Sequence, residues 1–229
     1  MKSERLLRIL SVCRKAGIIA DIGCDHGLLC AELVRSKKAE KAIATDISSA
    51  SLAKAEKLSK ELGLEGKIEC RLGDGLSVLQ PGEAEGIVIA GIGGPLLMRI
   101  LEQGWKVARS AQYLVLCPQN YPESLRQYIN EAGFLIEYEE ISQEKGKYYP
   151  IMRVCPGREK SYSPMELLVG RNVKKDENWA QYLQHEAEVQ CHIARQAGDG
   201  IAGQKARERA EHYEQALREY RKGEEQPWR

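Results

Sequence analysis

The chain has 229 residues, which suits one large domain with a small appendage, and its 43% hydrophobic residues are enough to bury a core. The formal net charge is +1, so the chain is no polycation and any nucleic-acid surface must be a local patch. The sequence contains no run of about 18 apolar residues and no signal-peptide pattern at its charged N-terminus, which predicts a cytoplasmic protein without a membrane span.

The seven cysteines are an odd number and include no C-x-x-C pair and no Cys/His knot at zinc spacing. Several lie inside apolar runs, where a free Cys behaves as a small hydrophobic residue. We therefore expect reduced thiols and no bound metal.

The first two thirds of the chain alternate between strand and helix patterns. Residues 5–13 have apolar side chains at helical spacing and many basic ones, which predicts a short amphipathic helix. Strands are then expected at 17–21, 41–46, 67–72, 86–90 and 113–117, with helices at 28–36, 48–62, 95–103 and 123–132. Two late strands, 134–141 and 148–154, are too close together for a crossover helix and must pair antiparallel.

This order predicts the fold class, an α/β Rossmann-like doubly wound sheet, mostly parallel with an antiparallel C-terminal hairpin strand. After Pro156, residues 177–196 and 204–221 read as two helices joined by a turn at 198–203, forming a coiled-coil-like α-helical hairpin. The side chains expected at the contact between these helices are Trp179, Tyr182, Leu183, Val189 and Ile193 on one and Ala210, Tyr213, Leu217 and Tyr220 on the other. We expect two domains, 1–156 and 157–229.

A loop rich in glycine and acid follows the first strand, with the sequence DIGCDHG at 21–27. Its G-x-x-x-G spacing differs from the G-x-G-x-x-G of a dinucleotide site, and its two carboxylates, Asp21 and Asp25, would repel a pyrophosphate. The same carboxylates suit the ammonium group of S-adenosylmethionine (SAM). The loop therefore favours SAM over a nicotinamide dinucleotide.

Three further strand ends also carry glycine or an acid. Asp46 closes the second strand, where an acid can bind ribose hydroxyls, and Asp74 follows the third, where it can accept a hydrogen bond from an adenine amino group. Glycines after the fourth strand leave room for a substrate. Taken singly, Asp46 fits a helix N-terminal acid equally well, Asp74 fits a turn residue, and His26 fits a packing residue. Together, on consecutive strands, they indicate one ligand site.

Four motifs resemble those of the bacterial tRNA (adenine-22-N1)-methyltransferase family: DIGCDHG, RLGDGL (71–76), GIVIAGIGG (86–94) and LVLCPQ (114–119). The match in order and spacing runs from about Leu6 to Val154, and the helical tail fits that family's C-terminal coiled-coil domain. The chain departs from the family at Gly27-Leu28, where the family has Ala-Tyr, and at Cys117-Pro118-Gln119, where it has Gln-Pro-Asn.

The resemblance implies a SAM-dependent methyltransferase that methylates N1 of an adenine in tRNA, with Asp25 as the catalytic carboxylate. The residues expected to bind the cofactor are Asp21, Gly23, Cys24, His26, Asp46, Ile47, Gly73, Asp74, Gly75, Ala90 and Gly91. The residues expected to bind the substrate are Ile92, Gly93, Gly94, Pro118, Gln119, Asn120, Arg5 and Arg8.

Further basic residues are candidates for contacts with tRNA phosphates, and three tyrosines for stacking on a flipped base. The basic candidates are Arg14, Lys15, Arg35, Lys37, Lys38, Lys41, Arg171, Lys174 and Lys175, and the aromatic ones are Tyr121, Tyr148 and Tyr149. Two alternatives stay open: a class I methyltransferase acting on another RNA, a protein or a small molecule, and a non-catalytic SAM-binding or RNA-binding adaptor. We expect a monomer or a weak homodimer.

Overall fold

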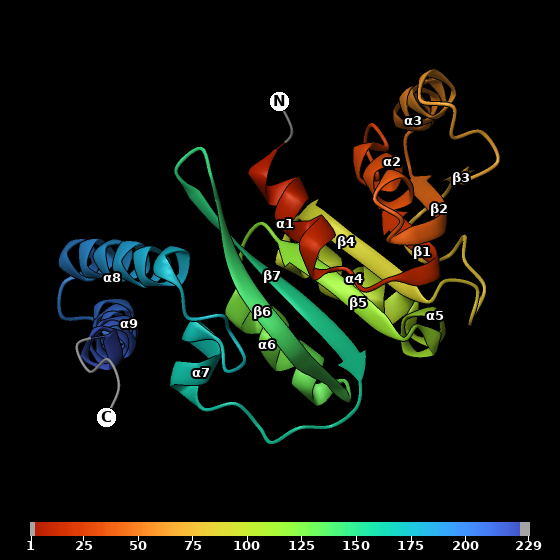
Figure 1. The fold of residues 1–229 in the computed structure, drawn as a ribbon. Coiled ribbons are helices and arrows are strands. Elements are labelled where there is room, and N and C mark those ends of the chain that lie inside the picture. The colour runs from red at the N-terminus through yellow and green to blue at the C-terminus, as the bar shows by residue number, and fades with distance from the viewer. Residues whose placement is uncertain (1–2, 225–229) are drawn as a thin grey trace.

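A seven-stranded sheet forms the centre of the protein in the computed structural model, which describes residues 3–224 (Figure 1). The strands are β1 (Ala16–Ile22), β2 (Ala39–Asp46), β3 (Ile68–Leu72), β4 (Gly86–Ile92), β5 (Tyr113–Pro118), β6 (Phe134–Glu144) and β7 (Lys147–Pro156). Their order is β3-β2-β1-β4-β5-β7-β6, and β7 alone runs antiparallel to its two neighbours. The predicted fold class is confirmed.

Helices cover both faces of the sheet. They are α1 (Glu4–Val12), α2 (Leu28–Arg35), α3 (Ser49–Glu61), α4 (Gly94–Gln103), α5 (Trp105–Ser110), α6 (Pro122–Glu131), α7 (Pro164–Val169), α8 (Glu177–Ala197) and α9 (Ile201–Glu224). Ile19, Val88 and Val115 pack with residues of α1 and α2, whereas Ile87, Ile89 and Leu114 pack with residues of α4 to α6. A sheet buried on both faces explains why the strands read as continuous apolar runs. The short helices α5 and α7 were not predicted.

The β6–β7 hairpin is longer than the sequence pattern indicates. Its strands extend to Glu144 and Lys147, which leaves only Lys145 and Gly146 in the turn. Both turn residues have positive φ, 51° and 75°, as a tight two-residue hairpin turn requires. The ends of these strands are polar, so hydrophobic periodicity did not indicate that the strands extend this far.

Helices α8 and α9 form the predicted antiparallel hairpin, but its contact face differs from the prediction. Trp179, Tyr182 and Leu183 are buried as predicted, but Val189 and Ile193 are 37% and 40% exposed, and Ala187 and Gln190 are buried in their place. The prediction followed the larger apolar side chains, whereas a close helix pair favours small residues. Helix α9 also begins at Ile201 rather than 204, because Gly203 lets its first turn approach α8 more closely than any side chain would allow.

The tail is anchored to the sheet by buried groups. Ile141 of β6 lies in one apolar cluster with Trp179, Leu183 and Tyr213. Arg126 of α6, fully buried, pairs with Glu139 of β6 at 2.5 Å and donates to the carbonyl of Leu168 in α7. Burial makes such a pair costly to break, so it fixes the start of the tail against the sheet. The expected second domain, 157–229, includes residues 225–229, and the first includes residues 1–2; both segments lie outside the described residues.

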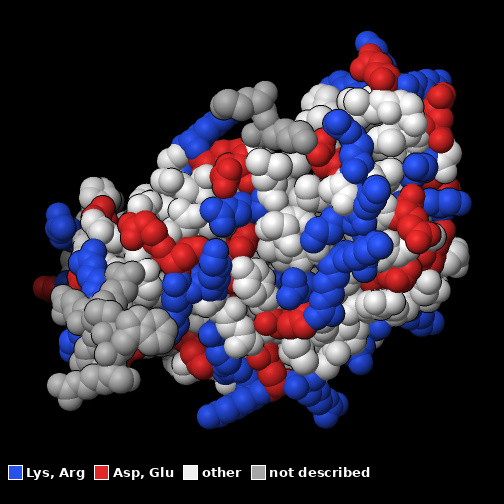
Figure 2. Space-filling view, in the orientation of Figure 1, with Lys and Arg blue, Asp and Glu red and all other residues white. Residues whose placement is uncertain are grey.

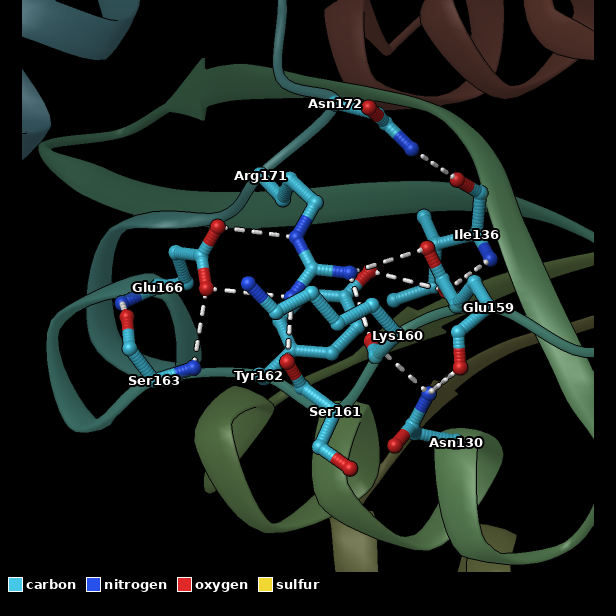
Figure 3. Close-up of polar contacts among 10 residues, drawn as sticks. All are labelled: Asn130, Ile136, Glu159, Lys160, Ser161, Tyr162, Ser163, Glu166, Arg171 and Asn172. Carbon is cyan, nitrogen blue, oxygen red and sulfur yellow. Dashed lines mark hydrogen bonds and ion pairs between the residues drawn. The ribbon is translucent and has the colours of Figure 1, made fainter.

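Arg171 organises the segment that leads into the tail (Figure 3). Its Nε and Nη2 donate to the two carboxylate oxygens of Glu166 at 2.8 and 3.0 Å, and Nη2 also donates to the Ser161 carbonyl at 2.6 Å. Its Nη1 donates to Glu159 at 3.4 Å and to the Lys160 carbonyl at 2.7 Å. All five N–H donors of the guanidinium are thus engaged. The expectation that Arg171 contacts a tRNA phosphate is wrong for this arrangement.

Within residues 3–224, no helix is both long and apolar enough to span a membrane. All seven cysteines are free thiols. The same part of the chain holds no group of three or more His, Cys, Asp or Glu side chains arranged to bind a metal ion.

Candidate functional site

A cavity of about 400 Å³ lies at the carboxyl ends of β1 and β4, beside α1 and α2. Ligands of doubly wound sheets bind at this edge. The expected site residues that line the cavity are Arg5, Asp21, Gly23, Cys24, Asp25, His26, Ala90, Gly91 and Ile92. Nine residues that the sequence pattern predicted for one site thus line one cavity.

The loop after β1 is held against the end of β2 by the backbone. The amides of Gly23 and Cys24 both donate to the carbonyl of Thr45 at 2.9 Å. Gly23 has φ of 77° and Asp25 has φ of 50°, so the chain turns through the left-handed region twice. Such a conformation in a non-glycine residue occurs mainly where the surroundings enforce it, often at functional sites. Here the left-handed conformations bring the backbone of Gly23 and Asp25 to the lining of the cavity.

Asp21 is a buried acid at the floor of the cavity, with 5% of its surface exposed. Burial raises the pKa of the Asp21 carboxyl to about 7, helped by the nearby charge of Asp46, while the Cys30 thiol, 3.8 Å away, counteracts part of the rise. A buried carboxyl with only a weak thiol donor is stabilised as an anion by a ligand cation. Asp21 is therefore suited to an ammonium group in the cavity.

Asp25 stands at the rim, with 72% of its side chain exposed. Its Oδ2 lies 2.7 Å from His26 Nδ1, and His26 Nε2 lies 3.1 Å from Lys54 Nζ on α3. Because an ammonium can only donate, Nε2 accepts from Lys54 and Nδ1 carries the proton that is donated to Asp25. The row Lys54–His26–Asp25 therefore orients the Asp25 carboxylate. No sequence pattern pointed to Lys54, which lies 28 residues after His26.

Asp46 connects the loop to the next strand end, although it does not line the cavity. Its Oδ2 accepts from the Asp25 amide at 3.1 Å and its Oδ1 from the Ser48 amide at 2.9 Å. Its carbonyl accepts from the Gly73 amide at 3.0 Å. Asp46 thus links the loop after β1 to the chain that follows β3. Ile47, Gly73, Asp74 and Gly75 are likewise outside the cavity lining.

The ends of β4 and β5 are joined by two side-chain amides. Gln119 Nε2 donates to the Gly91 carbonyl at 2.6 Å, and Asn120 Oδ1 accepts from the Gly94 amide at 2.9 Å. A Cβ on Gly94 would lie 2.6 Å from the Asn120 carbonyl, so only glycine permits this approach. The expected substrate residues Ile92, Gly93, Gly94, Pro118, Gln119 and Asn120 therefore lie along one pair of strand ends, and only Ile92 lines the cavity.

Helix α1 forms a wall of the cavity that the sequence did not indicate. Ser3, Leu6 and Ile9 line it from α1, and Leu28 and Leu29 line it from α2. Arg5 also lines it and lies 4.7 Å from the Tyr149 ring centroid, whereas Arg8 does not line it and donates to Glu4 at 3.0 Å. The pattern showed an amphipathic helix but not where its apolar face would pack.

Basic side chains gather on the face shown in Figure 2, in a band over α2 and the loop after α1. Two hydrogen bonds hold the segments of this band together: the Ala16 amide donates to the Lys38 carbonyl, and Lys38 Nζ donates to the Cys13 carbonyl. These contacts bring the end of α1 beside the end of α2. Two groups that are separate in sequence thereby meet: Arg14 and Lys15 on one side, Arg35, Lys37 and Lys38 on the other.

The residues present fit SAM by their chemistry. The cavity combines the buried Asp21 carboxyl, which favours a cation, with the backbone of Gly91, whose φ of 76° and open Cβ position allow close approach of a ligand. Asp46, which accepts from the Asp25 amide, adds a second carboxylate next to this edge.

Comparison with known proteins identifies close relatives. A methyltransferase-domain family matches residues 2–152. The tRNA (adenine(22)-N(1))-methyltransferase of Bacillus subtilis is 32% identical over 223 residues, covering 93% of this chain and 94% of the relative. A solved Streptococcus pneumoniae structure, described as a candidate tRNA (m1A22) methyltransferase, has 31% identity and a TM-score of 0.88, covering 95% of this chain and all of that one. The same protein with S-adenosyl-L-methionine bound has a TM-score of 0.86 at 31% identity, with the same coverage.

Proposed function

The chain belongs to the tRNA (adenine(22)-N(1))-methyltransferase family, and on that premise we propose that it transfers a methyl group from SAM to N1 of adenine 22 in tRNA. The observation that carries the proposal is the oriented Asp25 carboxylate at the rim of a cavity suited to SAM. Relatives crystallised with SAM support the choice of cofactor.

Asp21 is proposed to pair with the ammonium group of SAM, and Asp46 to accept hydrogen bonds from the ribose hydroxyls. Asp74 is proposed to accept from the adenine amino group of the cofactor. The backbone of Gly23, Cys24, Ala90 and Gly91 then surrounds the ligand, with His26 and Ile47 at its edges. When bound, SAM supplies an electrophilic methyl group.

The Asp25 carboxylate is proposed to act on the target adenine. Adenine N1 has a free lone pair at neutral pH, so no base is needed before it attacks the methyl group. The product carries a positive charge on the base, and a carboxylate beside the exocyclic amine stabilises that charge as it develops. The same carboxylate can then take a proton from the amine. His26 and Lys54 hold it in position.

The substrate tRNA is proposed to lie across the cavity mouth, with phosphates on the basic band of α1 and α2. Residues 1–156 then form the SAM-binding domain and residues 157–229 a helical domain that helps to hold the tRNA. Gly93, Gly94, Gln119 and Asn120 are proposed to contact the target base. We further propose a cytoplasmic enzyme that acts as a monomer or a weak homodimer.

The test is methylation of tRNA by the purified protein. The protein is incubated with unmodified tRNA and SAM labelled on its methyl group, and the labelled nucleoside and its position are then identified. Label in 1-methyladenosine at position 22 is expected. Label in another nucleoside would move the reaction to a different RNA position, and SAM binding without any label in tRNA would favour another substrate or an adaptor.

A further inference from the structure

A second cavity, of about 260 Å³, lies between the end of β5 and the helical hairpin. The loop after β5 forms one side, the start of β7 another, and α8 and α9 the third. This cavity brings the tail together with the catalytic half of the chain. A volume near the lower limit of small-ligand pockets suits a single flat group.

Four tyrosines line the second cavity: Tyr121, Tyr148, Tyr182 and Tyr213. The rings of Tyr148 and Tyr182 lie with centroids 6.1 Å apart, and those of Tyr182 and Tyr213 lie 6.2 Å apart. Tyr182 and Tyr213 are almost fully buried, so their positions are fixed by packing. Rigid aromatic side chains are the usual surface on which proteins stack an unpaired base.

The polar residues of the second cavity are incompletely paired. Arg209 of α9 donates from Nη2 to Glu123 at 2.8 Å, while its Nε is buried without a hydrogen-bond partner. Such orphaned donors are rare in folded proteins and call for a ligand or water. Glu186 of α8 lines the same cavity, and burial raises the pKa of its carboxyl. Within residues 3–224, the carboxylate oxygens of Glu186 have no hydrogen-bond partner.

The charges around the second cavity favour a neutral ligand. Two carboxylates, Glu123 and Glu186, surround the one guanidinium of Arg209, and this excess of negative charge opposes a phosphate. A ligand that presents N–H donors to Glu186 and an acceptor to Arg209 would satisfy both groups. Guanine alone among the four common bases offers two adjacent N–H donors, on N1 and N2, beside the acceptor O6.

A hydrogen bond links a residue that lines the second cavity to a residue that lines the catalytic cavity. Gln119 lines the second cavity and donates to the carbonyl of Gly91, which lines the first. The two cavities therefore adjoin across this loop. On this ground we propose that the second cavity binds a guanine base of the tRNA, unstacked near the target adenine. Glu186 accepts from its N1–H and N2–H, Arg209 donates to its O6, and the partly exposed ring of Tyr148 stacks on it.

The proposal rests on tRNA being the substrate, so its test measures binding separately from methyl transfer. Fluorescently labelled tRNAs carrying inosine in place of one guanosine at a time are titrated with the full chain, and binding is followed by anisotropy. Inosine lacks the N2 amino group. One position should weaken binding about tenfold, the usual effect of losing one good base contact.

The variant Glu186→Gln should bind unmodified tRNA about tenfold more weakly and should lose its response to inosine at that position. Glu188→Gln, on the exposed side of the same helix, should respond to inosine as the unchanged protein does. Arg209→Lys, which keeps the charge beside Glu123 but removes Nε–H, should also weaken binding. A thermal melt of each variant establishes that it is folded.

The proposal is overturned if no inosine position depends on Glu186, or if Glu186→Gln binds tRNA as tightly as the unchanged protein. Binding of free guanosine monophosphate that depends on Glu186, without coupling to any tRNA position, would overturn the assignment to tRNA in favour of a free nucleotide. If the inosine effect depends on Glu186 but tRNA is not methylated, the second cavity binds guanine and the proposed reaction is wrong. If tRNA is methylated but no inosine effect depends on Glu186, the proposed reaction stands and the guanine site is wrong.

Discussion

Two carboxylates four residues apart have opposite environments, and this difference assigns them different roles. Asp21 is buried and lacks a strong donor, so it suits a cation inside the cavity. Asp25 is exposed at the rim and is oriented by His26, so it can meet a group that enters from outside. The sequence shows both acids, but only their exposure separates the carboxylate proposed to bind SAM from the one proposed to act on the adenine.

Replacement of Asp25 by Asn should reduce kcat for tRNA methylation by about a hundredfold or more, because the charge that stabilises the methylated base is lost. Asn tolerates the left-handed backbone at this position and keeps the side-chain size. SAM affinity, measured by calorimetry, should change little. A variant with full kcat would show that Asp25 is not catalytic.

SAM affinity should depend on pH through Asp21. Its pKa of about 7 means that its carboxylate becomes ionised as the pH rises through 7, and the ion pair with the SAM ammonium strengthens accordingly. Between about pH 6 and about pH 7.5, below the pKa of an amino group, affinity should rise about fivefold.

Calorimetric titrations at each pH check this dependence on Asp21. Asp21→Asn should bind weakly and without that rise, whereas Asp74→Asn should bind more weakly but keep it. A rise that persists in Asp21→Asn would assign the titration to another group.

The same pKa predicts that the ligand-free protein loses stability from about pH 4 to about pH 7, where the unfolded chain has already released the Asp21 proton and the folded one has not.

At the scale of elements, the conformation of the loop after β1 depends on how α2 packs against α3. Gly27 begins α2 with φ of 69°, and a Cβ there would lie 2.7 Å from the Cβ of Ala55. This contact brings α3 close enough for Lys54 to reach His26. Helix packing and the active-site row therefore depend on the same glycine.

Gly27→Ala should lower the free energy of unfolding by about 2–4 kcal/mol, because left-handed strain and overpacking add. Gly66→Ala is the matched control, since Gly66 also has positive φ, 77°, but its Cβ would meet nothing within 4 Å. Strain alone should cost this control about 1–2 kcal/mol. Urea unfolding of both variants measures the difference, and equal losses would show that contact with Ala55 is unimportant.

At the scale of the whole molecule, basic residues from separate segments form one band where β1 and β2 begin, at the opposite ends of these strands from the catalytic cavity. Lys15 follows α1 and Lys37 follows α2, and both are exposed. The net charge of the chain is only +1, so attraction to tRNA must come from such a local band.

The double variant Lys15→Gln/Lys37→Gln should weaken tRNA binding and should reduce the slope of log affinity against log salt by about 2, roughly one for each lost phosphate contact. Lys57→Gln, on α3 beside Glu61, should leave the slope unchanged. Anisotropy titrations at several salt concentrations give the slopes. An unchanged slope in the double variant would place the phosphate backbone elsewhere.

The sheet, the helical tail and the loop at the end of β1 could be predicted from the amino-acid sequence alone, because hydrophobic period, turn residues and strand-end acids are local signals. The sequence could not determine the wall formed by Leu6 and Ile9, the row from Lys54 to Asp25, or the engagement of Arg171. These depend on which faces meet when elements distant in the chain pack together. The second cavity is the clearest case, since Glu123, Glu186 and Arg209 lie on three helices that only the tertiary fold brings together.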